Sequence, residues 1–339
     1  MVKVLFIIMT SLLIFGCKTD AKPILETTKI ENAKNTLPHD VIPFMDKWKI
    51  LCGDGSKSED LIDYTNEGFF YVEKQHNTNW VVYKTPNAGI TSKPSQNTRT
   101  ELHQKKYWTA KQRGMLTATL KVQHVSTSGD ASVPSSYCTV IGQIHSADGH
   151  ENEPLKIYYK KFPGHEKGSV FWNYEINTQG DNSGRWDFST AVWGYNFSVL
   201  GTGPNTYPDE TEDGIKLGEE FSYEVNVLDG VMYLTFSSEN HETFSFAKSL
   251  IKSDFPEESE IPQRIIVAYS SRRSVSPEKE NAYADELLYF KQGNYNQANP
   301  KSTKSEVYGG DIEKQYANGS YAEVWFREAH LGSAKPIKH

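Results

Sequence analysis

Several features that define other protein classes are scarce in this chain of 339 residues. Basic residues do not dominate: 36 Lys and Arg stand against 43 Asp and Glu, giving a net charge of −7, whereas nucleic-acid binders usually carry a basic surface. The chain lacks the long apolar runs of a multi-span membrane protein, the collagen repeat and coiled-coil heptads. No G-x-S-x-G nucleophile elbow occurs, which argues against a Ser-His-Asp hydrolase of that type. We therefore expect a globular protein with no nucleic-acid partner.

Aromatic residues, in contrast, are abundant, and short alternating segments recur along the chain. The composition is 37% hydrophobic and 12% aromatic with 24 Gly, which is enough apolar material for a large core and favours β structure. Short helices are predicted only at Pro43–Leu51 and Phe246–Ile251. The loop-like stretch 177–216 is expected to line the edge of a cleft. Strands are predicted at Met115–Gln123, Leu155–Lys160, Ser169–Glu175, Glu219–Leu228, Val231–Phe236, Arg264–Tyr269 and Ala322–His330.

These segments together indicate the fold class. The Asp229-Gly230 pair lies between two predicted strands and is typical of a tight hairpin turn. Many short strands separated by turns, with little helical periodicity, predict an all-β antiparallel sandwich or barrel.

The N-terminus resembles an export signal that ends at a cysteine. A basic start is followed by an apolar run, Val4–Phe15, which is too short to span a bilayer comfortably and fits a signal-peptide core. The run leads into Gly16-Cys17, which resembles a bacterial lipobox. We therefore predict a signal peptide at 1–16, lipidation of Cys17, a flexible tether at 17–40 and a globular domain at 41–339. The chain would be an exported lipoprotein anchored at a membrane, in the outer membrane, at the cell surface or in the periplasm; an ordinary signal peptide is the alternative.

Two further cysteines, Cys52 and Cys138, remain in the predicted domain. In an exported protein they could form one disulfide, but spacing alone does not show that the sulfur atoms meet. Two separate buried thiols are equally compatible with the sequence.

Three segments carry polar side chains at strand spacing. On an extended strand, alternate residues share a face, so each segment would present its polar groups to one side. Side by side, the three strands would form a sheet face of Arg, Gln, His, Lys and Tyr. The segments are Arg99-Thr100-Glu101-Leu102-His103, Gln143-Ile144-His145 and Tyr289-Phe290-Lys291-Gln292-Gly293-Asn294-Tyr295-Asn296-Gln297.

These segments resemble, in order and spacing, the RxEx(R), QIH and YFKxGxYxQ motifs of the polysaccharide lyase family 7 alginate lyases. The resemblance covers residues from about 41 to 331 and implies a β-jelly-roll sandwich of two antiparallel sheets with a catalytic groove on the concave face. The third motif matches completely. His103 departs from the family pattern, because many members have a second Arg at that position.

The resemblance also implies an activity: β-elimination at the 4-O-linkage of a uronic-acid polysaccharide, which leaves a 4,5-unsaturated uronate and needs neither metal nor cofactor. Alginate or its oligosaccharides would be the partner, and the protein would be a monomer. Arg99 and Gln143 would neutralise the substrate carboxylate, and Tyr295 would be the general acid. Whether His145 or Tyr295 is the base stays open, because the two uronate epimers present C5–H on opposite sides. Substrate-binding roles fall to Glu101, His103, Tyr289, Lys291, Gln297 and Arg273.

Other interpretations remain. A non-catalytic carbohydrate-binding module or a lyase for another polyuronate, such as a glucuronan, would share much of this surface. A glycosidase would need two carboxyl groups, and Glu220 and Glu224 are the nearest strand-borne pair. The spacing of His145 and His150 matches no usual zinc site. By the same resemblance, Ile144 in the middle of its motif implies a preference for guluronate or mixed blocks as substrate. The 177–216 stretch, together with a surface anchor, favours exolytic over endolytic cleavage.

Overall fold

The computed structural model describes residues 31–32, 36–92, 95–147, 153–178, 181–251, 286–300 and 311–337, with backbone alone at 31–32, 176–178 and 181–186. Cys17, His150, Arg273 and the predicted strand Arg264–Tyr269 lie outside these residues. Among the described helices, none is long and apolar enough to cross a bilayer.

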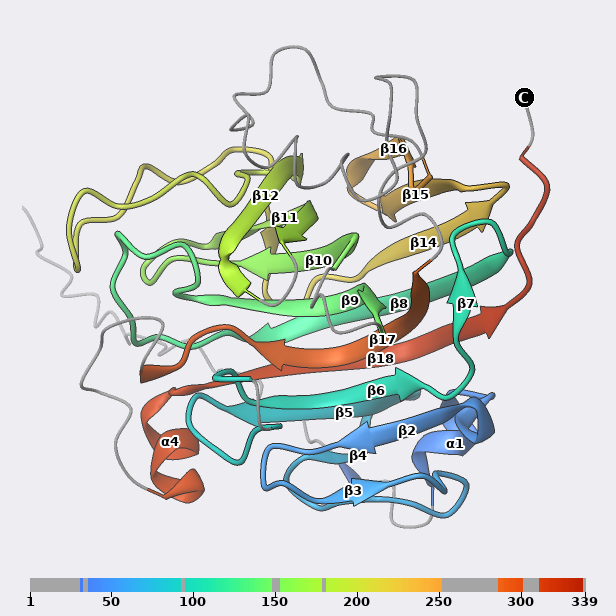
Figure 1. Ribbon diagram of the computed structural model, residues 1–339. Coiled ribbons are helices and arrows are strands. Elements are labelled where there is room, and N and C mark those ends of the chain that lie inside the picture. The colour runs from blue at the N-terminus through green and yellow to red at the C-terminus, as the bar shows by residue number, and fades with distance from the viewer. Residues whose placement is uncertain are drawn as a thin grey trace, which may run out of the picture.

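Two antiparallel sheets stack face to face and form a sandwich (Figure 1). The first has the order β1-β4-β5-β18-β8-β14-β15-β16, and the second β12-β11-β10-β9-β17-β6-β2-β3, with β13 beside β11 and β7 beside β17. The strands of the first sheet are β1 Glu31–Asn32, β4 Phe70–Gln75, β5 Thr78–Pro86, β8 Gly114–His124, β14 Phe221–Leu228, β15 Val231–Ser238, β16 His241–Ser249 and β18 Tyr321–Gly332. Those of the second are β2 Trp48–Leu51, β3 Lys57–Ser58, β6 Arg99–Gln104, β7 Trp108–Thr109, β9 Cys138–Ser146, β10 Leu155–Lys160, β11 Lys167–Thr178, β12 Asp181–Trp193, β13 Ile215–Lys216 and β17 Leu287–Asn296. The described helical segments are α1 Pro38–Val41, the 3-10 turn Met45–Lys47 and α4 Ile312–Asn318.

The all-β prediction is confirmed, and so are the alternating segments that fall within the described residues. β10 begins and ends at the predicted residues, and β8, β11, β15 and β18 extend the predicted strands by a few residues. Asp229 and Gly230 both have positive φ, 51° and 81°, as the predicted two-residue hairpin requires. Leu228 and Val231 pair across this turn.

Two local predictions were wrong, and a third, the helix at Pro43–Leu51, was correct only in part. The segment Pro43–Leu51 holds only a 3-10 turn before β2, where Trp48 and Ile50 alternate into the core. Phe246–Ile251 is mostly strand β16, because its side chains pair with those of β15 rather than forming a helical stripe. The first part of 177–216 is strand β12, paired along most of its length with β11; only the second part is a connection.

Strand β17 presents polar side chains on both faces of the second sheet. Its even-numbered residues point into the sandwich, where buried Gln292 donates to the Tyr223 hydroxyl (2.8 Å) and Asn294 donates to the carbonyl groups of Tyr83 and Ala322 (2.9 and 2.8 Å). These three bonds join the two sheets. The odd-numbered residues Tyr289, Lys291 and Tyr295 therefore face the opposite side, away from the core.

The two cysteines of the domain are both buried and both free. Cys52 contacts the Tyr64 hydroxyl at 3.8 Å, and Cys138 contacts the Ser135 carbonyl at 3.4 Å. The sequence left open either one disulfide or two separate buried thiols, and the structure has two separate thiols.

Candidate active site

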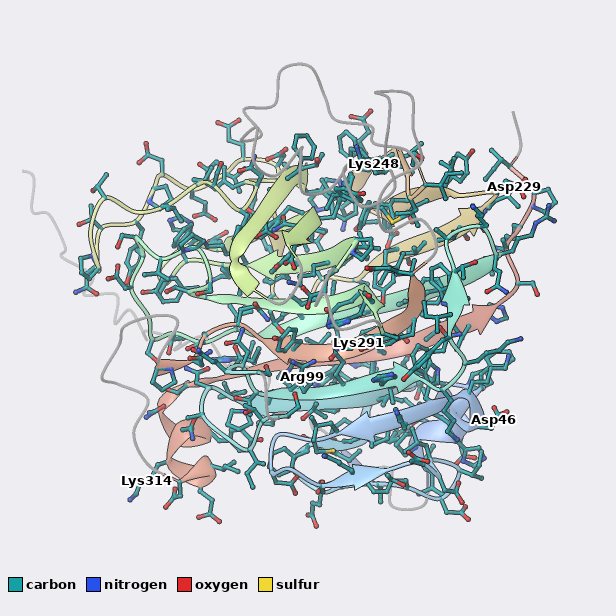
Figure 2. All side chains as sticks on the ribbon, in the orientation of Figure 1. Asp46, Arg99, Asp229, Lys248, Lys291 and Lys314 are labelled. Carbon is teal, nitrogen blue, oxygen red and sulfur yellow. The ribbon has the colours of Figure 1, made fainter. Side chains whose placement is uncertain are left out.

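The outward face of the second sheet carries a groove of about 740 Å³. Its floor is built from β2, β6, β17, β9 and β10, which are neighbours in the sheet. Figure 2 shows Arg99 and Lys291 near the middle of this face, whereas Asp46, Asp229 and Lys314 lie at the periphery of the molecule. The polar residues of the three sequence motifs therefore gather where a long ligand could lie across the strands.

One row of the floor runs straight across five strands. In register, Lys49 pairs with His103, His103 with Lys291, Lys291 with Gln143, and Gln143 with Lys156. Lysines thus occur at every second strand, about 10 Å apart at the usual strand spacing. Lys49 and Lys291 give this row positive charge that suits an anionic ligand, whereas Lys156 is paired with Glu153 and Glu175.

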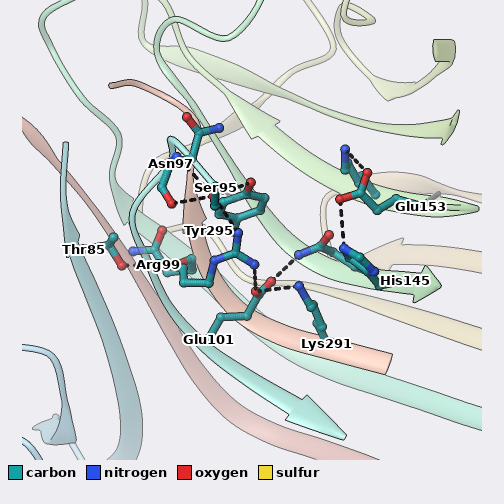
Figure 3. Close-up of polar contacts among 12 residues, drawn as sticks. Thr85, Ser95, Asn97, Arg99, Glu101, His145, Glu153, Lys291 and Tyr295 are labelled. Carbon is teal, nitrogen blue, oxygen red and sulfur yellow. Dashed lines mark hydrogen bonds and ion pairs between the residues drawn. The ribbon is translucent and has the colours of Figure 1, made fainter. Parts of the chain in front are cut away.

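Glu101 organises the centre of the groove (Figure 3). It is 3% exposed and receives three donors: Arg99 Nη1 at 3.2 Å, Lys291 Nζ at 3.7 Å and the amide of Gln143. A buried carboxylate needs such partners, because an uncompensated charge in the interior is costly. Through these contacts the Glu101 carboxylate orients both Arg99 and Gln143, in addition to the substrate-binding role that the resemblance implies for it.

Tyr295 lies against Arg99 through its ring. The guanidinium carbon is 3.8 Å from the ring centroid, and both residues contact Ser95: Arg99 Nη2 donates to Ser95 Oγ at 3.0 Å, and the Tyr295 hydroxyl is 3.4 Å from the same oxygen. Burial lowers the pKa of Arg99, but the charges of Tyr295 and Glu101 outweigh burial and raise it. Arg99 is therefore a permanent cation beside a phenol.

Gly293 explains the strand geometry that leads to Tyr295. Its φ is +141°, and a Cβ there would lie 2.7 Å from the Thr100 carbonyl oxygen. The pairing of β17 with β9 shifts register between Gln292 and Tyr295, whereas the pairing with β6 stays regular. The bulge therefore needs glycine, and Tyr295 remains opposite Arg99.

His145 has both ring nitrogens close to acceptors. Nδ1 is 2.6 Å from the Ser146 carbonyl oxygen, and Nε2 is 3.3 Å from Glu153 Oε1. Burial and the Lys291 charge lower the pKa of His145, while Glu153 opposes them. The ring is therefore held in one orientation at the edge of the groove (Figure 3).

The region around His103 is more aromatic than expected. The imidazole stacks on the Tyr289 ring with centroids 3.9 Å apart and planes 9° apart. Burial, followed by the charges of Lys291 and Lys49, lowers the pKa of His103 to about 2. At that pKa the His103 ring is neutral, so it does not supply the positive charge of the second Arg that many family members have at this position. Tyr289 packs between His103 and His145, consistent with a packing role.

Most of the predicted site residues come together in this groove, and Gln297 lies at one end, where its amide oxygen accepts from Asn97 at 3.2 Å. Glu220 and Glu224 do not: they lie at the first sheet, in ion pairs with Arg327 (2.9 Å) and Lys335 (3.0 Å), so they form no glycosidase pair here. Five residues of the groove were not predicted. Lys49, Glu153 and Lys156 reach it through long-range strand pairing, and Ser95 and Asn97 lie in the connection just before β6.

No group of three or more metal-ligating side chains occurs among the described residues. The side chains that line the groove supply cations, amides, an imidazole and a phenol.

Comparisons with known proteins agree with this geometry. A protein-family model described as alginate lyase matches residues 42–333. The crystal structure of the exolytic alginate lyase AlyA5 from Zobellia galactanivorans is 62% identical and superposes with a TM-score of 0.81, covering 89% of this chain and 99% of that one. The alginate lyase structure from Klebsiella pneumoniae, 22% identical with a TM-score of 0.63, covers 88% and 99% and shares the fold. A curated Klebsiella pneumoniae alginate lyase is 30% identical over 190 residues, 54% of this chain; the match spans about half of that relative, 48% of its length.

Proposed function

The chain belongs to the alginate lyase family of polysaccharide lyases, and from this premise we propose that it is an exolytic alginate lyase that cleaves uronate chains by β-elimination. The observation that carries the proposal is the placement of Arg99, Gln143, His145 and Tyr295 on three adjacent strands of one groove. A sheet face used only for binding would not need an imidazole and a phenol beside a buried guanidinium–amide pair.

The reaction makes a specific electrostatic demand. The proton at C5 of a uronate is α to a carboxylate, so its removal develops a second negative charge on a group that is already anionic. Catalysis therefore requires fixed donors directed at that carboxylate. Arg99 supplies a permanent cation, and Gln143 supplies an amide whose orientation is fixed by Glu101. Lys291 adds a cation in the next strand.

The proton transfers need one base and one acid. In the step that we propose, the C5–H bond breaks, its electrons form the C4=C5 double bond, and the C4–O4 bond breaks. The Tyr295 hydroxyl gives its proton to O4, and His145 takes the C5 proton when C5–H is presented on its side of the sugar. For the other epimer, Tyr295 would both take the C5 proton and protonate O4.

Exolytic action is proposed because AlyA5, with 62% identity over nearly its whole length, is described as exolytic. The test is a product-size time course on alginate, followed together with the ultraviolet absorbance of the conjugated enoate. Early and steady release of monomer or dimer with rising absorbance supports the proposal. Mixed oligomers at early times would show endolytic action, and a flat absorbance trace would show binding without catalysis.

Guluronate or mixed-block preference is a further part of the proposal. Ile144, on which the sequence argument rests, is fully buried between the sheets, so its influence on substrate would act through the position of its neighbours Gln143 and His145. Initial rates on guluronate-rich and mannuronate-rich blocks decide the preference.

We also propose that the protein is anchored by lipid at Cys17, which the sequence Gly16-Cys17 supports. Replacing Cys17 with Ser should move the protein from the membrane fraction to the soluble fraction when it is expressed in a bacterium. Equal distribution of the variant and the unchanged protein would argue for an ordinary signal peptide.

The pH dependence of substrate capture should report Lys291. Burial, followed by the neighbouring Arg99 charge, lowers the pKa of Lys291 to about 8. Lys291 is charged below that pH and loses its charge above it, so kcat/KM should fall as the pH rises through about 8. The variant Lys291→Arg keeps its charge, and we expect the alkaline fall to move to higher pH. A profile of kcat/KM from neutral to alkaline pH checks this; an unchanged alkaline limb in the variant would assign it to another group.

A further inference from the structure

The hydrogen bonds of His145 pose a chemical problem. The Ser146 carbonyl can only accept, so the 2.6 Å contact requires a proton on Nδ1. In the neutral ring, Nε2 then has only a lone pair, yet it faces Glu153 Oε1 at 3.3 Å. Two lone pairs in contact are unfavourable, whereas a protonated Nε2 would complete a good ion pair. The Glu153 contact therefore favours the imidazolium and opposes burial and the Lys291 charge, which lower the pKa of His145.

The negative charge of Glu153 is itself supported by a buried network. Lys156 Nζ is 2.8 Å from Glu153 Oε2 and 2.6 Å from Glu175 Oε2, and Glu175 is fully buried. Burial raises the pKa of Glu153, but Lys156 and His145 outweigh burial and hold it well below the usual range. Burial and the Glu153 charge raise the pKa of Glu175. Within this network the anion is thus Glu153, directed at His145.

We propose that Glu153 is a positioning residue that orients the His145 ring and stabilises the imidazolium formed when His145 takes the C5 proton. This inference rests on the proposed lyase function. In the step, the C5–H electrons form the C4=C5 bond, the C4–O4 bond breaks, and Tyr295 protonates O4. The Nε2 lone pair, the one ring nitrogen without a hydrogen in the neutral form, takes the C5 proton, so the new positive charge of the ring lies beside the negative charge of Glu153.

The other groups facing His145 make this role necessary. Lys291 on β17 is positively charged, and His103 on β6 is neutral. The Tyr289 ring stacks on His145 with centroids 5.2 Å apart, and Lys156 pairs with the other oxygen of Glu153. Burial and Lys291 both disfavour a charged His145. Glu153 is the acidic side chain that the structure places against Nε2 to oppose them, so without it the imidazole would be a weaker base.

The test replaces Glu153 with Gln, which keeps the shape and removes the charge. We expect kcat on guluronate-rich alginate to fall about 10-fold or more, within the usual contribution of a general base. The acid limb of the kcat/KM profile should move to lower pH, because the pKa of His145 falls. Glu59→Gln is the matched control for the pKa of His145: Glu59 is an exposed carboxylate, and the structure gives no contact between it and His145. Glu153→Asp, which retains the charge, should recover part of the rate.

A direct titration keeps the inference testable without turnover. The pKa of His145, followed by NMR with labelled histidine, should be lower in Glu153→Gln than in the unchanged protein and in Glu59→Gln. Equal pKa values in all three, or an acid limb that does not move, would overturn the positioning role. If the unchanged protein produced no enoate, the proposed function would fail, while the titration would still report on the His145–Glu153 pair.

Discussion

Replacing Tyr295 with Phe should lower kcat by about 10³-fold or more, while KM and the melting temperature change little, because the contribution of a single positioned proton donor is roughly 10²–10⁴. The reason is local. The Tyr295 ring contacts the Arg99 guanidinium at 3.8 Å, and this contact and the packing survive in Phe. The hydroxyl, 3.4 Å from Ser95 Oγ, is lost, and with it the proton for O4. Initial rates of enoate formation at saturating alginate measure the effect.

The matched control is Tyr289→Phe on the same strand. Its ring packs between two histidines, and burial followed by the Glu101 charge raises the pKa of its hydroxyl above that of a free tyrosine, so it is a poor proton donor. This variant should keep most of the rate. If Tyr295→Phe retained most of its activity, or if both variants lost it equally, the acid would have to be another group.

Replacing Arg99 with Lys should reduce kcat/KM by about 10²-fold, the usual consequence of losing one preorganised donor to a developing oxyanion. The charge is kept, but the planar fork that reaches both Ser95 and Glu101 is lost. Arg99 is 8% exposed, so solvent cannot readily substitute for the missing donors. The rate at low substrate concentration, with circular dichroism as the check on folding, measures the change.

Arg113→Lys is the control for this substitution. Arg113 forms an exposed pair with Asp229 at 3.2 Å, and exposed ion pairs contribute little. Its activity and stability should match those of the unchanged protein. An Arg99→Lys variant with normal kcat/KM would mean that charge alone, rather than bidentate geometry, neutralises the substrate carboxylate.

Local alternation was sufficient to predict several of the strands, among them β8, β10, β11, β15 and β18, and the face that each motif residue occupies. Arg99, Glu101 and His103 share one face of β6 because a strand repeats every two residues, and the same rule places Tyr289, Lys291 and Tyr295 together on β17. The order of the motifs in the chain does not specify their order in space. That order, β9-β17-β6, comes from pairing between segments more than 100 residues apart.

Three of the missed residues have roles that depend on that long-range pairing. Lys49 and Lys156 join the cationic row only through register with His103 and Gln143, which no local pattern reveals. Glu153 precedes β10 and contacts His145 because β9 and β10 are antiparallel neighbours. An acidic residue a few positions after a motif histidine, just before a predicted strand, was the one available signal.

The wrong helix prediction has a related cause. In Phe246–Ile251, apolar residues occur close together, and a short apolar run does not by itself distinguish helix from strand. Tertiary pairing makes this segment a strand: Phe244 and Phe246 of β16 pair with Phe236 and Leu234 of β15, and β16 forms the edge of the sheet.

The central claim is that a uronate chain is broken by elimination in this groove, and the mass of the products tests it most directly. Incubation of the purified protein with a defined saturated alginate oligosaccharide should give one fragment lighter by one water than its saturated counterpart, with enoate absorbance appearing at the same rate. The Tyr295→Phe variant should give neither. Two saturated fragments whose masses together exceed that of the substrate by one water, with no enoate, would show hydrolysis. An unchanged oligosaccharide that nevertheless binds would show a carbohydrate-binding protein, and either result would contradict the account.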